Sequence, residues 1–277
     1  MTRKRPHPPV LKRFGQHFLN DRSALEDIAD AGGASGSDIV IEIGPGRGSL
    51  TELLLARAAR VIVIEIDHML AERLRERYAS NQRITVVESD VLEVRFTDLV
   101  NEPFIVVGNV PYYITTPILF HTLGAPLPKR CVFLVQHEVA ERIVATPGSR
   151  DYGALTVNVQ AVARAEIVRG VPPGAFSPPP KVDSAVVRLT PLDSPLIPVE
   201  ELDEFRSFVL AVFGMRRKQI ANVLRSVRRI SLERANEILA SEGIDPTARP
   251  EMLSPLQLAA LMRNTRANER LSESSDW

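Results

Sequence analysis

The segment GNVPYYITTP, residues 108–117, places an amide, a proline and two tyrosines directly after the apolar run FIVV. The Asn109 side-chain oxygen and the Val110 carbonyl are two acceptors that can hold both hydrogens of an exocyclic amino group, and Pro111 would fix the direction of that carbonyl. Tyr112 offers a flat face on which an extruded base can stack. The segment therefore predicts a site that aims a base nitrogen at an electrophile by positioning and preorganised dipoles, without a covalent intermediate.

Three earlier segments place glycines or acids at the ends of apolar runs. Gly44 and Gly46, in EIGPGRGSL, have no Cβ atoms, so this turn can approach a ligand closely. Glu65 can accept the hydroxyls of a ribose, and Asp90 can accept from an adenine amino group. Ser49 stands where the dinucleotide fingerprint G-x-G-x-x-G needs a third glycine. A ribose acid and an adenine acid without a pyrophosphate site favour S-adenosylmethionine over NAD.

Each feature also has a plainer interpretation. A glycine-rich turn can be only a tight turn, an acid after a strand often caps a helix, and a tyrosine pair can cover a core. Four such features at four successive strand ends together favour a ligand site.

The elements that must position these residues alternate between strands and helices. Five short apolar runs predict parallel strands covered on both faces: DIVIEIG, RVIVIEI, RITVVES, PFIVVGN and RCVFLVQ. Helical patterns such as SLTELLLARA and HMLAERLRERYA lie between them. The expected fold is α/β, a doubly wound, Rossmann-like sheet, which binds ligands at the carboxyl ends of its strands. The stretches ALTVNVQAVA and SAVVRLT predict two or more added strands around Leu155 to Leu189.

After the Pro-rich stretch that ends near Pro191 the pattern becomes helical. We therefore expect a catalytic domain with a basic N-terminal arm at 1–190, a helical RNA-binding domain at 191–268 and a disordered tail at 269–277. The chain has 277 residues, of which 44% are apolar and 25% charged, and it lacks a signal-peptide pattern, so a cytoplasmic protein is expected. His121 and His137 have no partners at metal-ligand spacing, and no metal is expected.

The formal net charge is zero, yet the basic residues are segregated. Residues 1–20 contain five Lys or Arg and no acid, and residues 205–232 contain seven and no acid. Such segregation indicates a polyanion-binding face, although solvated charge on a helix surface is the simpler alternative. Arg216, Arg217 and Lys218 are expected at the start of a helix, where three cations suggest a phosphate nearby.

The motifs together resemble the rRNA adenine dimethyltransferase family. The resemblance rests on FGQHFL, EIGPGRGSLT, VIEID, SDVL, GNVPYYITTP, FSPPPKVDSAVVRL and FGMRRKQIANVL, in the family's order over nearly the whole chain. It is greatest to the bacterial small-subunit (16S) branch, the kasugamycin-sensitivity family. Those enzymes dimethylate two adjacent adenosines in a hairpin loop near the 3′ end of the rRNA.

The resemblance implies that the sheet is of the class I methyltransferase type, with a small C-terminal helical domain, and it implies roles for individual residues. His17 and Leu19 would contact S-adenosylmethionine from the N-terminal arm, Asn109 would be shared between cofactor and target, and Phe176 would stack on the target base opposite Tyr112. The remaining cofactor residues would be Gly44, Gly46, Glu65 and Asp90. The chain departs from the family's usual residues in having His17 for Asn, Val110 for Leu, and Tyr113 where Asn often stands.

Other functions stay open at this point. The nearest enzymatic alternative is a 23S rRNA adenine methyltransferase of the macrolide-resistance type, which shares the same motifs. A non-catalytic RNA-binding assembly factor is the alternative of a different class, and a nicotinamide dehydrogenase is the weakest. The expected partner is 16S rRNA in the immature small subunit, bound by a monomer.

Overall fold

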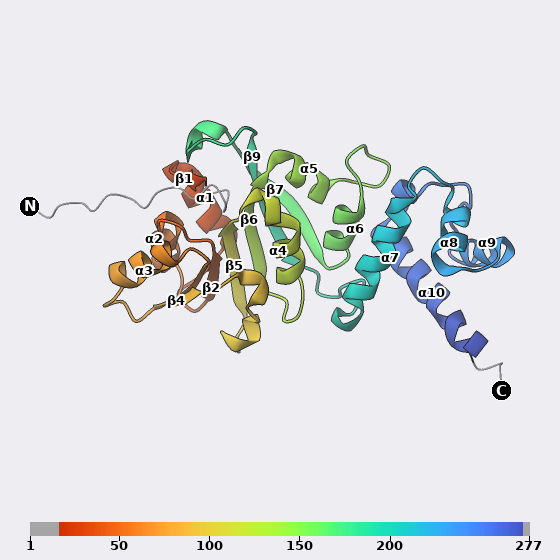
Figure 1. Ribbon diagram of the computed structural model, residues 1–277, viewed down its shortest axis with the longest axis horizontal. Coiled ribbons are helices and arrows are strands. Elements are labelled where there is room, and N and C mark those ends of the chain that lie inside the picture. Colours follow the sequence, from red (N-terminus) through yellow and green to blue (C-terminus); the bar gives the residue numbers. More distant parts are fainter. Residues whose placement is uncertain (1–16, 274–277) are drawn as a thin grey trace, which may run out of the picture. The chain divides into compact units, whose positions relative to one another are not determined.

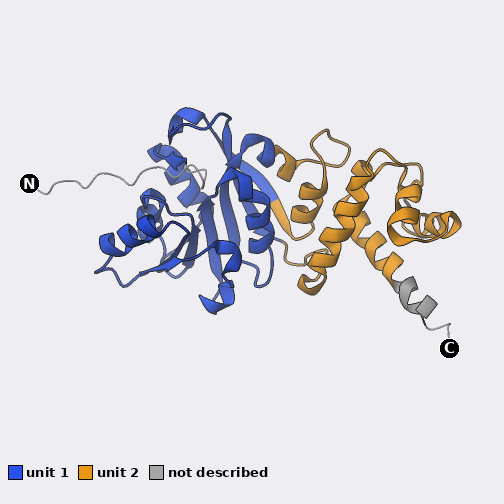
Figure 2. Ribbon diagram, in the orientation of Figure 1, with its two compact units in different colours: residues 1–140, 165–191 blue, residues 141–164, 192–277 orange. Residues whose placement is uncertain are grey.

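A computed structural model describes residues 17–273, with side chains described up to residue 266 (Figure 1). The chain forms two compact units, residues 1–140 with 165–191 and residues 141–164 with 192–277 (Figure 2). The break after residue 191 adjoins the expected boundary, but residues 141–164, expected in the first domain, belong to the second unit. Residues 1–16 of the expected basic arm lie outside the described residues. Residues 274–277 of the expected tail also lie outside them, whereas residues 269–273 belong to a helix that ends at Glu273.

A seven-stranded sheet has the order β4-β3-β2-β5-β6-β9-β7. Its strands are β2 (Ile39–Ile43), β3 (Arg60–Glu65), β4 (Ile84–Glu88), β5 (Phe104–Asn109), β6 (Arg130–Gln136), β7 (Ala163–Val171) and β9 (Ser184–Pro191). The strands from β4 to β6 pair in parallel, and β9 pairs antiparallel with β6. The order reverses between β2 and β5, which is where ligands bind in such sheets. The predicted doubly wound fold and its five parallel strands are confirmed.

The central strands are apolar on both faces because helices cover both. Val61 and Val63 of β3 belong to a buried cluster that also contains residues of α1 (Arg22–Gly32), α2 (Ser49–Leu55) and α3 (His68–Arg77). Ile62 and Ile64 alternate with them and are equally buried. Alternation toward two covered faces explains why these strands have continuous apolar sequences rather than an apolar and polar alternation.

A second, two-stranded sheet holds the first described residues in place. β1 (Phe18–Leu19) pairs antiparallel with β8 (Phe176–Ser177), so that Leu19 lies opposite Phe176. Asn20 continues the pairing, since its N–H donates to the Ala175 carbonyl. The segment that precedes α1 is thereby fixed by a loop more than 150 residues later in the chain.

One expected strand is wrong. The segment ALTVNVQAVA contains a helix, α6 (Ala154–Gln160), and the added strand β7 begins only at the last residue of the segment, Ala163. Residues 155–159 are all buried, and a short buried helix has the same unbroken apolar sequence as a buried strand. The Thr156 hydroxyl donates to the Arg142 carbonyl, and the Asn158 side-chain nitrogen donates to the Ala154 carbonyl, so both of these buried donors have partners.

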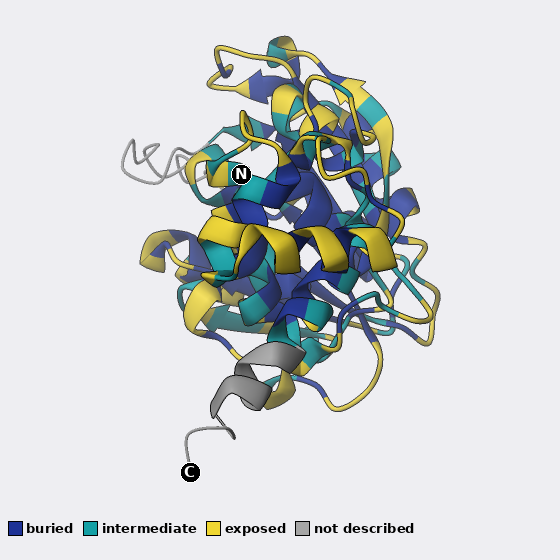
Figure 3. Cartoon of the chain, turned by 90° about the vertical axis from the view of Figure 1, so that its right-hand side faces the viewer, coloured by how far each residue is buried: buried dark blue, intermediate teal, exposed yellow. Residues whose placement is uncertain are grey.

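The second unit is helical. Its helices are α6, α7 (Leu202–Gly214), α8 (Ile220–Arg228), α9 (Leu232–Ser241) and α10 (Pro255–Glu273), while α5 (His137–Val144) crosses the boundary between the units. Exposed and buried residues lie on opposite sides of helices such as α9 (Figure 3). Within residues 17–273, none of the helices combines the length and the apolarity that crossing a bilayer requires.

Short 3-10 turns connect several elements. They are η2 (Val91–Glu93), η3 (Phe96–Asp98), η4 (Tyr112–Ile114), η5 (Pro173–Ala175), η6 (Val199–Glu201) and η7 (Pro250–Met252). Helix α4 (Thr115–Thr122) follows η4 directly. The predicted tyrosine segment is thus a tight turn between a buried strand and a helix.

Candidate active site

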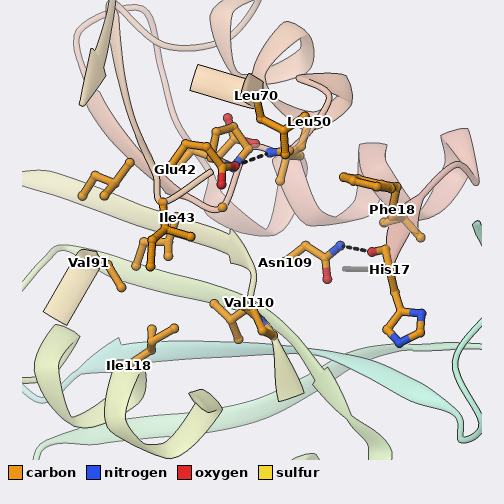
Figure 4. Close-up of a pocket in the computed structure, with 18 of the residues that line it drawn as sticks. His17, Phe18, Glu42, Ile43, Leu50, Leu70, Val91, Asn109, Val110 and Ile118 are labelled. Carbon is orange, nitrogen blue, oxygen red and sulfur yellow. Dashed lines mark hydrogen bonds between the residues drawn. The ribbon is translucent and has the colours of Figure 1, made fainter. Parts of the chain in front are cut away.

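A pocket of about 150 Å³ lies at the carboxyl ends of β2, β3 and β5 and beside η2. Its lining comes from chain segments that are distant in sequence, including the segment before α1 and the tyrosine turn (Figure 4). All but one of the residues predicted for cofactor binding and catalysis line it: His17, Leu19, Gly44, Gly46, Glu65, Asp90, Asn109, Val110, Pro111 and Tyr112. The fold therefore brings the four strand-end features together, as the sequence predicts.

The glycine turn at the end of β2 is shaped by its missing side chains. Gly44 and Gly46 have φ values of 66° and 55°, in the left-handed region that other residues rarely adopt. A Cβ on Gly46 would lie 3.0 Å from the Phe18 ring. The glycines thus allow this turn to curl back while the segment before α1 packs closely over it.

Glu65, at the end of β3, is 4% exposed. One carboxylate oxygen accepts the Gly46 N–H at 3.0 Å, and the other accepts the Asp67 N–H at 2.9 Å. Burial raises the pKa of Glu65, and these backbone hydrogen bonds oppose the rise. Each oxygen keeps a lone pair for a further donor, so the carboxylate is held ready to accept a pair of hydroxyls.

Asp90 acts as the N-cap of η2. Its Oδ1 accepts the Leu92 N–H at 2.9 Å, so the plainer interpretation of this acid as a cap is correct. The same residue lines the pocket, and its second oxygen takes no part in that cap. Ile66 and Val91 lie beside it in the lining and supply an apolar surface of the kind that a purine ring packs against.

Asn109, the last residue of β5, is fixed by the segment before α1. Its Nδ2 donates to the His17 carbonyl at 3.0 Å (Figure 4). Because the amide nitrogen is engaged there, the acceptor Oδ1 is the atom left to receive a donor in the pocket. The segment before α1 therefore orients the residue that the sequence places at the centre of the chemistry.

Tyr112 is held at both ends. Its hydroxyl lies 2.6 Å from the Ser184 hydroxyl, and its ring stacks on His17 with centroids 5.9 Å apart and planes 19° from parallel. His17 itself is fixed by a 2.9 Å contact between its Nδ1 and the Pro178 carbonyl. Burial raises the pKa of Tyr112, so its hydroxyl stays neutral and the residue offers a ring rather than a base.

Phe176 is the predicted residue that the structure does not bring to the pocket. It is 5% exposed and belongs to the apolar cluster that contains Leu19 and Val171. Its pairing with Leu19 across β1 and β8 buries the ring, which leaves no free face for a base in this structure. Its role here is to anchor the segment before α1 by packing in this cluster.

Two charged lining residues, Glu42 and Arg47, were missed from the sequence. Glu42 in β2 is 1% exposed and accepts a 2.6 Å hydrogen bond from the Thr51 hydroxyl. Burial raises its pKa to about 8, with the charge of Glu65 adding to the rise. Arg47 stacks its guanidinium 4.2 Å from the centre of the Phe18 ring. Glu42 could have been identified from the sequence because it lies within the apolar run IVIEI, and a buried strand rarely contains an acid.

The three predicted RNA-binding residues lie in the second unit. Arg216, Arg217 and Lys218 are exposed, and they occupy the turn between α7 and α8 rather than the start of a helix, since α8 begins at Ile220. Two other basic residues of the same run turn inward. Arg206 pairs with Asp203, and Arg228 lies 3.8 Å from Glu204 and over the Phe208 ring. Arg225 and Arg229 are exposed.

Among the residues that the structure describes, no three His, Cys, Asp or Glu side chains gather as a metal site would require. Cys131 is fully buried in β6, and burial raises the pKa of its thiol.

Comparison with known proteins gives consistent matches over most of the chain. The profile of the family described as "Ribosomal RNA adenine dimethylase" matches residues 10–264. Over 255 residues the chain is 42% identical to "Ribosomal RNA small subunit methyltransferase A" of Caldanaerobacter subterraneus subsp. tengcongensis, which covers 90% of this chain and 95% of the relative.

Two solved structures share the fold of the chain. A dimethyladenosine transferase from Plasmodium falciparum matches with a TM-score of 0.80 and 28% identity, covering 91% of this chain and 98% of that one. The 23S rRNA methyltransferase ErmE matches with a TM-score of 0.69 and 32% identity, covering 90% and 99%. From the family profile, the relatives and the strand-end residues gathered in one pocket, we conclude that this chain belongs to the ribosomal RNA adenine dimethylase family.

Proposed function

We propose that this protein transfers methyl groups from S-adenosylmethionine to the N6 amino groups of two adjacent adenosines in a hairpin loop near the 3′ end of 16S rRNA. The observation that carries the proposal is the position of Asn109, Val110, Pro111 and Tyr112, which line one pocket with Glu65 and Asp90. The family membership and a relative named as a small-subunit methyltransferase support the same reaction and substrate.

The pocket suits S-adenosylmethionine. Bound there, this cofactor supplies an electrophilic methyl group on a sulfonium. Glu65 would accept from the ribose hydroxyls, and Asp90 would accept from the adenine amino group through the oxygen that its cap leaves free. Gly44 and Gly46 leave room for the amino acid end of the cofactor, and His17 and Leu19 border it from the segment before α1.

The target adenosine would be held by the end of β5. Asn109 Oδ1 and the Val110 carbonyl would accept the two N6 hydrogens, which turns the nitrogen lone pair out of conjugation with the ring. Pro111 has a φ of −59°, fixed by its own ring, and so restrains the peptide that presents this carbonyl. Tyr112 would stack on the base. The proton released when the new N–C bond forms would leave to water, because no titratable base is needed at the nitrogen.

The substrate would be recognised through its phosphates by exposed basic residues. Arg216, Arg217 and Lys218 supply three such cations in the second unit. We place the enzyme in the cytoplasm, acting as a monomer on the immature small subunit. The similarity to ErmE makes 23S rRNA the alternative substrate, which the choice of ribosomal subunit in the assay distinguishes.

The test is transfer of labelled methyl groups to under-methylated small subunits, with large subunits as the control. Asn109→Ala should slow transfer by roughly a hundred- to a thousand-fold, the loss expected for one preorganised polar group. RNA binding should change little, because phosphate contacts dominate it. Asn101→Ala, at an exposed position away from the pocket lining, is the matched control and should keep full activity.

Each alternative gives a different result. Labelling of the large subunit alone would favour the macrolide-resistance type of substrate. Wild-type protein that binds the small subunit but transfers no methyl group would refute the enzyme proposal and favour an assembly factor. An Asn109→Ala variant with wild-type rate would remove this side chain from the chemistry.

A further inference from the structure

Tyr113 is the one exposed Phe, Tyr or Trp side chain among residues 17–266. Its relative exposure is 65%, whereas Tyr152 is buried and Tyr78 and Tyr112 are partly buried. Apolar rings are usually removed from water, because leaving them exposed forgoes the hydrophobic free energy of burial. A single exposed ring that also lines the pocket is therefore a candidate for contact with a ligand.

The turn η4 gives Tyr113 a different direction from Tyr112. Successive side chains in a 3-10 turn are about 120° apart, so the two rings cannot share one orientation. The Tyr112 hydroxyl is fixed by Ser184 and its ring is stacked on His17. With Phe176 buried, Tyr113 is the aromatic side chain at this pocket that most freely offers a flat face to a second ligand group.

We propose that Tyr113 is a stacking platform for the adenosine that neighbours the target base. This inference rests on the proposed function, in which the two target adenosines are adjacent. The flat face of Tyr113, beside Tyr112, would hold one base of the pair while the other occupies the pocket. Tyr113 would thus favour a purine next to the target and help the two adenosines to enter the pocket one after the other.

The physical reason lies in the cost of base extrusion. Moving one base into a pocket takes away a stacking partner of its neighbour, which is unfavourable unless another flat surface replaces it. The backbone link keeps the neighbour close to the target, and an exposed ring beside Tyr112 is within the reach of such a base. Aromatic stacking of this kind contributes roughly 1–3 kcal/mol per base, equivalent to about a 5- to 150-fold change in an equilibrium or rate.

The experiment measures kcat/KM for methyl transfer to one adenosine of the pair on three kinds of small subunit. In these, the neighbouring position holds adenosine, guanosine or uridine. Tyr113→Ala should lower kcat/KM by roughly 5- to 150-fold with either purine neighbour and clearly less with uridine, whose smaller ring stacks more weakly. Tyr113→Phe should stay near wild type, because it keeps the flat face. Calorimetric titration should show unchanged affinity for S-adenosylmethionine.

Leu210→Ala, at a position that is 59% exposed in α7, is the control for loss of an exposed apolar side chain. It should leave all three rates unchanged. A Tyr113→Ala variant that loses the same factor with all three neighbours, or loses nothing, would overturn the inference while leaving the proposed function intact. A fall in cofactor affinity would overturn it in favour of a role at the cofactor site. Wild-type protein that methylates no small subunit would refute the proposed function itself, and with it this inference.

Discussion

Replacing Glu42 by glutamine should change how the stability of this protein depends on pH. Glu42 is almost fully buried in β2, and its partner is the hydroxyl of Thr51 at 2.6 Å. Burial raises its pKa from 4.5 to about 8, the Thr51 hydrogen bond opposes that rise, and the nearby charge of Glu65 adds to it. The folded protein therefore keeps a neutral acid beneath its glycine turn at neutral pH.

The sign follows from proton binding in the two states. Below about pH 4.5 the Glu42 carboxyl is protonated in both the folded and the unfolded chain, and its full contribution to stability is present. Between 4.5 and about 8 only the folded chain holds the proton, so the free energy of unfolding falls as pH rises. Each pH unit in this window costs about 1.4 kcal/mol. From pH 6 to pH 8 the loss from Glu42 is roughly 2–3 kcal/mol.

Urea unfolding followed by circular dichroism at pH 6, 7, 8 and 9 would measure this dependence. The Glu42→Gln variant has a neutral side chain at every pH. From pH 6 to pH 8 its free energy of unfolding should therefore fall by roughly 2–3 kcal/mol less than that of wild type. The two proteins are compared by the slope of the free energy of unfolding against pH, since the extra hydrogen-bond donor of glutamine can alter the absolute stability. Glu93→Gln, at an exposed position, should follow wild type. Parallel curves for wild type and Glu42→Gln would refute the argument.

Three further predictions concern the ligands. Glu65→Ala should weaken S-adenosylmethionine binding by about ten- to a hundred-fold in a folded protein, because charge-assisted hydrogen bonds are lost, and calorimetric titration with unchanged affinity would remove Glu65 from the site. Tyr112→Ala should lose both base capture and rate, whereas Tyr112→Phe should keep most activity, and equal rates for the two variants would exclude stacking. Replacing Arg216, Arg217 and Lys218 by alanine should weaken RNA binding and lower its salt slope by roughly 0.7–0.9 for each phosphate that is no longer neutralised, with cofactor affinity unchanged. An unaltered salt dependence would mean that these cations face solvent alone.

The sequence predicted the sheet where burial leaves a strong pattern. Five strands are rich in apolar, often β-branched residues because both of their faces are covered, and the acids and glycines at their ends stand out against that background. The position of β7 was not predicted because charged residues such as Arg164, Glu166 and Arg169 interrupt its apolar sequence at the edge of the sheet. The helix α6 was mistaken for a strand because a buried helix of seven residues shows no period.

The errors at the site have a different cause. Phe176 and Arg228 have the residue types that stacking and phosphate binding need, but tertiary contacts turn both inward. Glu42 was overlooked because its neutral state depends on how deeply the fold buries it. Sequence spacing shows which residues reach one edge of a sheet, whereas the direction of each side chain depends on partners that lie far along the chain.

The pairing of β1 with β8 has a consequence for how this protein is made. Asp90, Asn109 and the glycine turn are all synthesised before residue 176. The segment before α1, which contacts Asn109 and packs against Gly46, pairs with a strand that is synthesised later. Closing a loop of this length carries an entropic cost that later packing must offset. A nascent chain would hence contain Glu65 and Asp90 before the His17 carbonyl is held in position to accept the hydrogen bond that orients Asn109. The pocket can therefore be completed only after β8 has emerged from the ribosome.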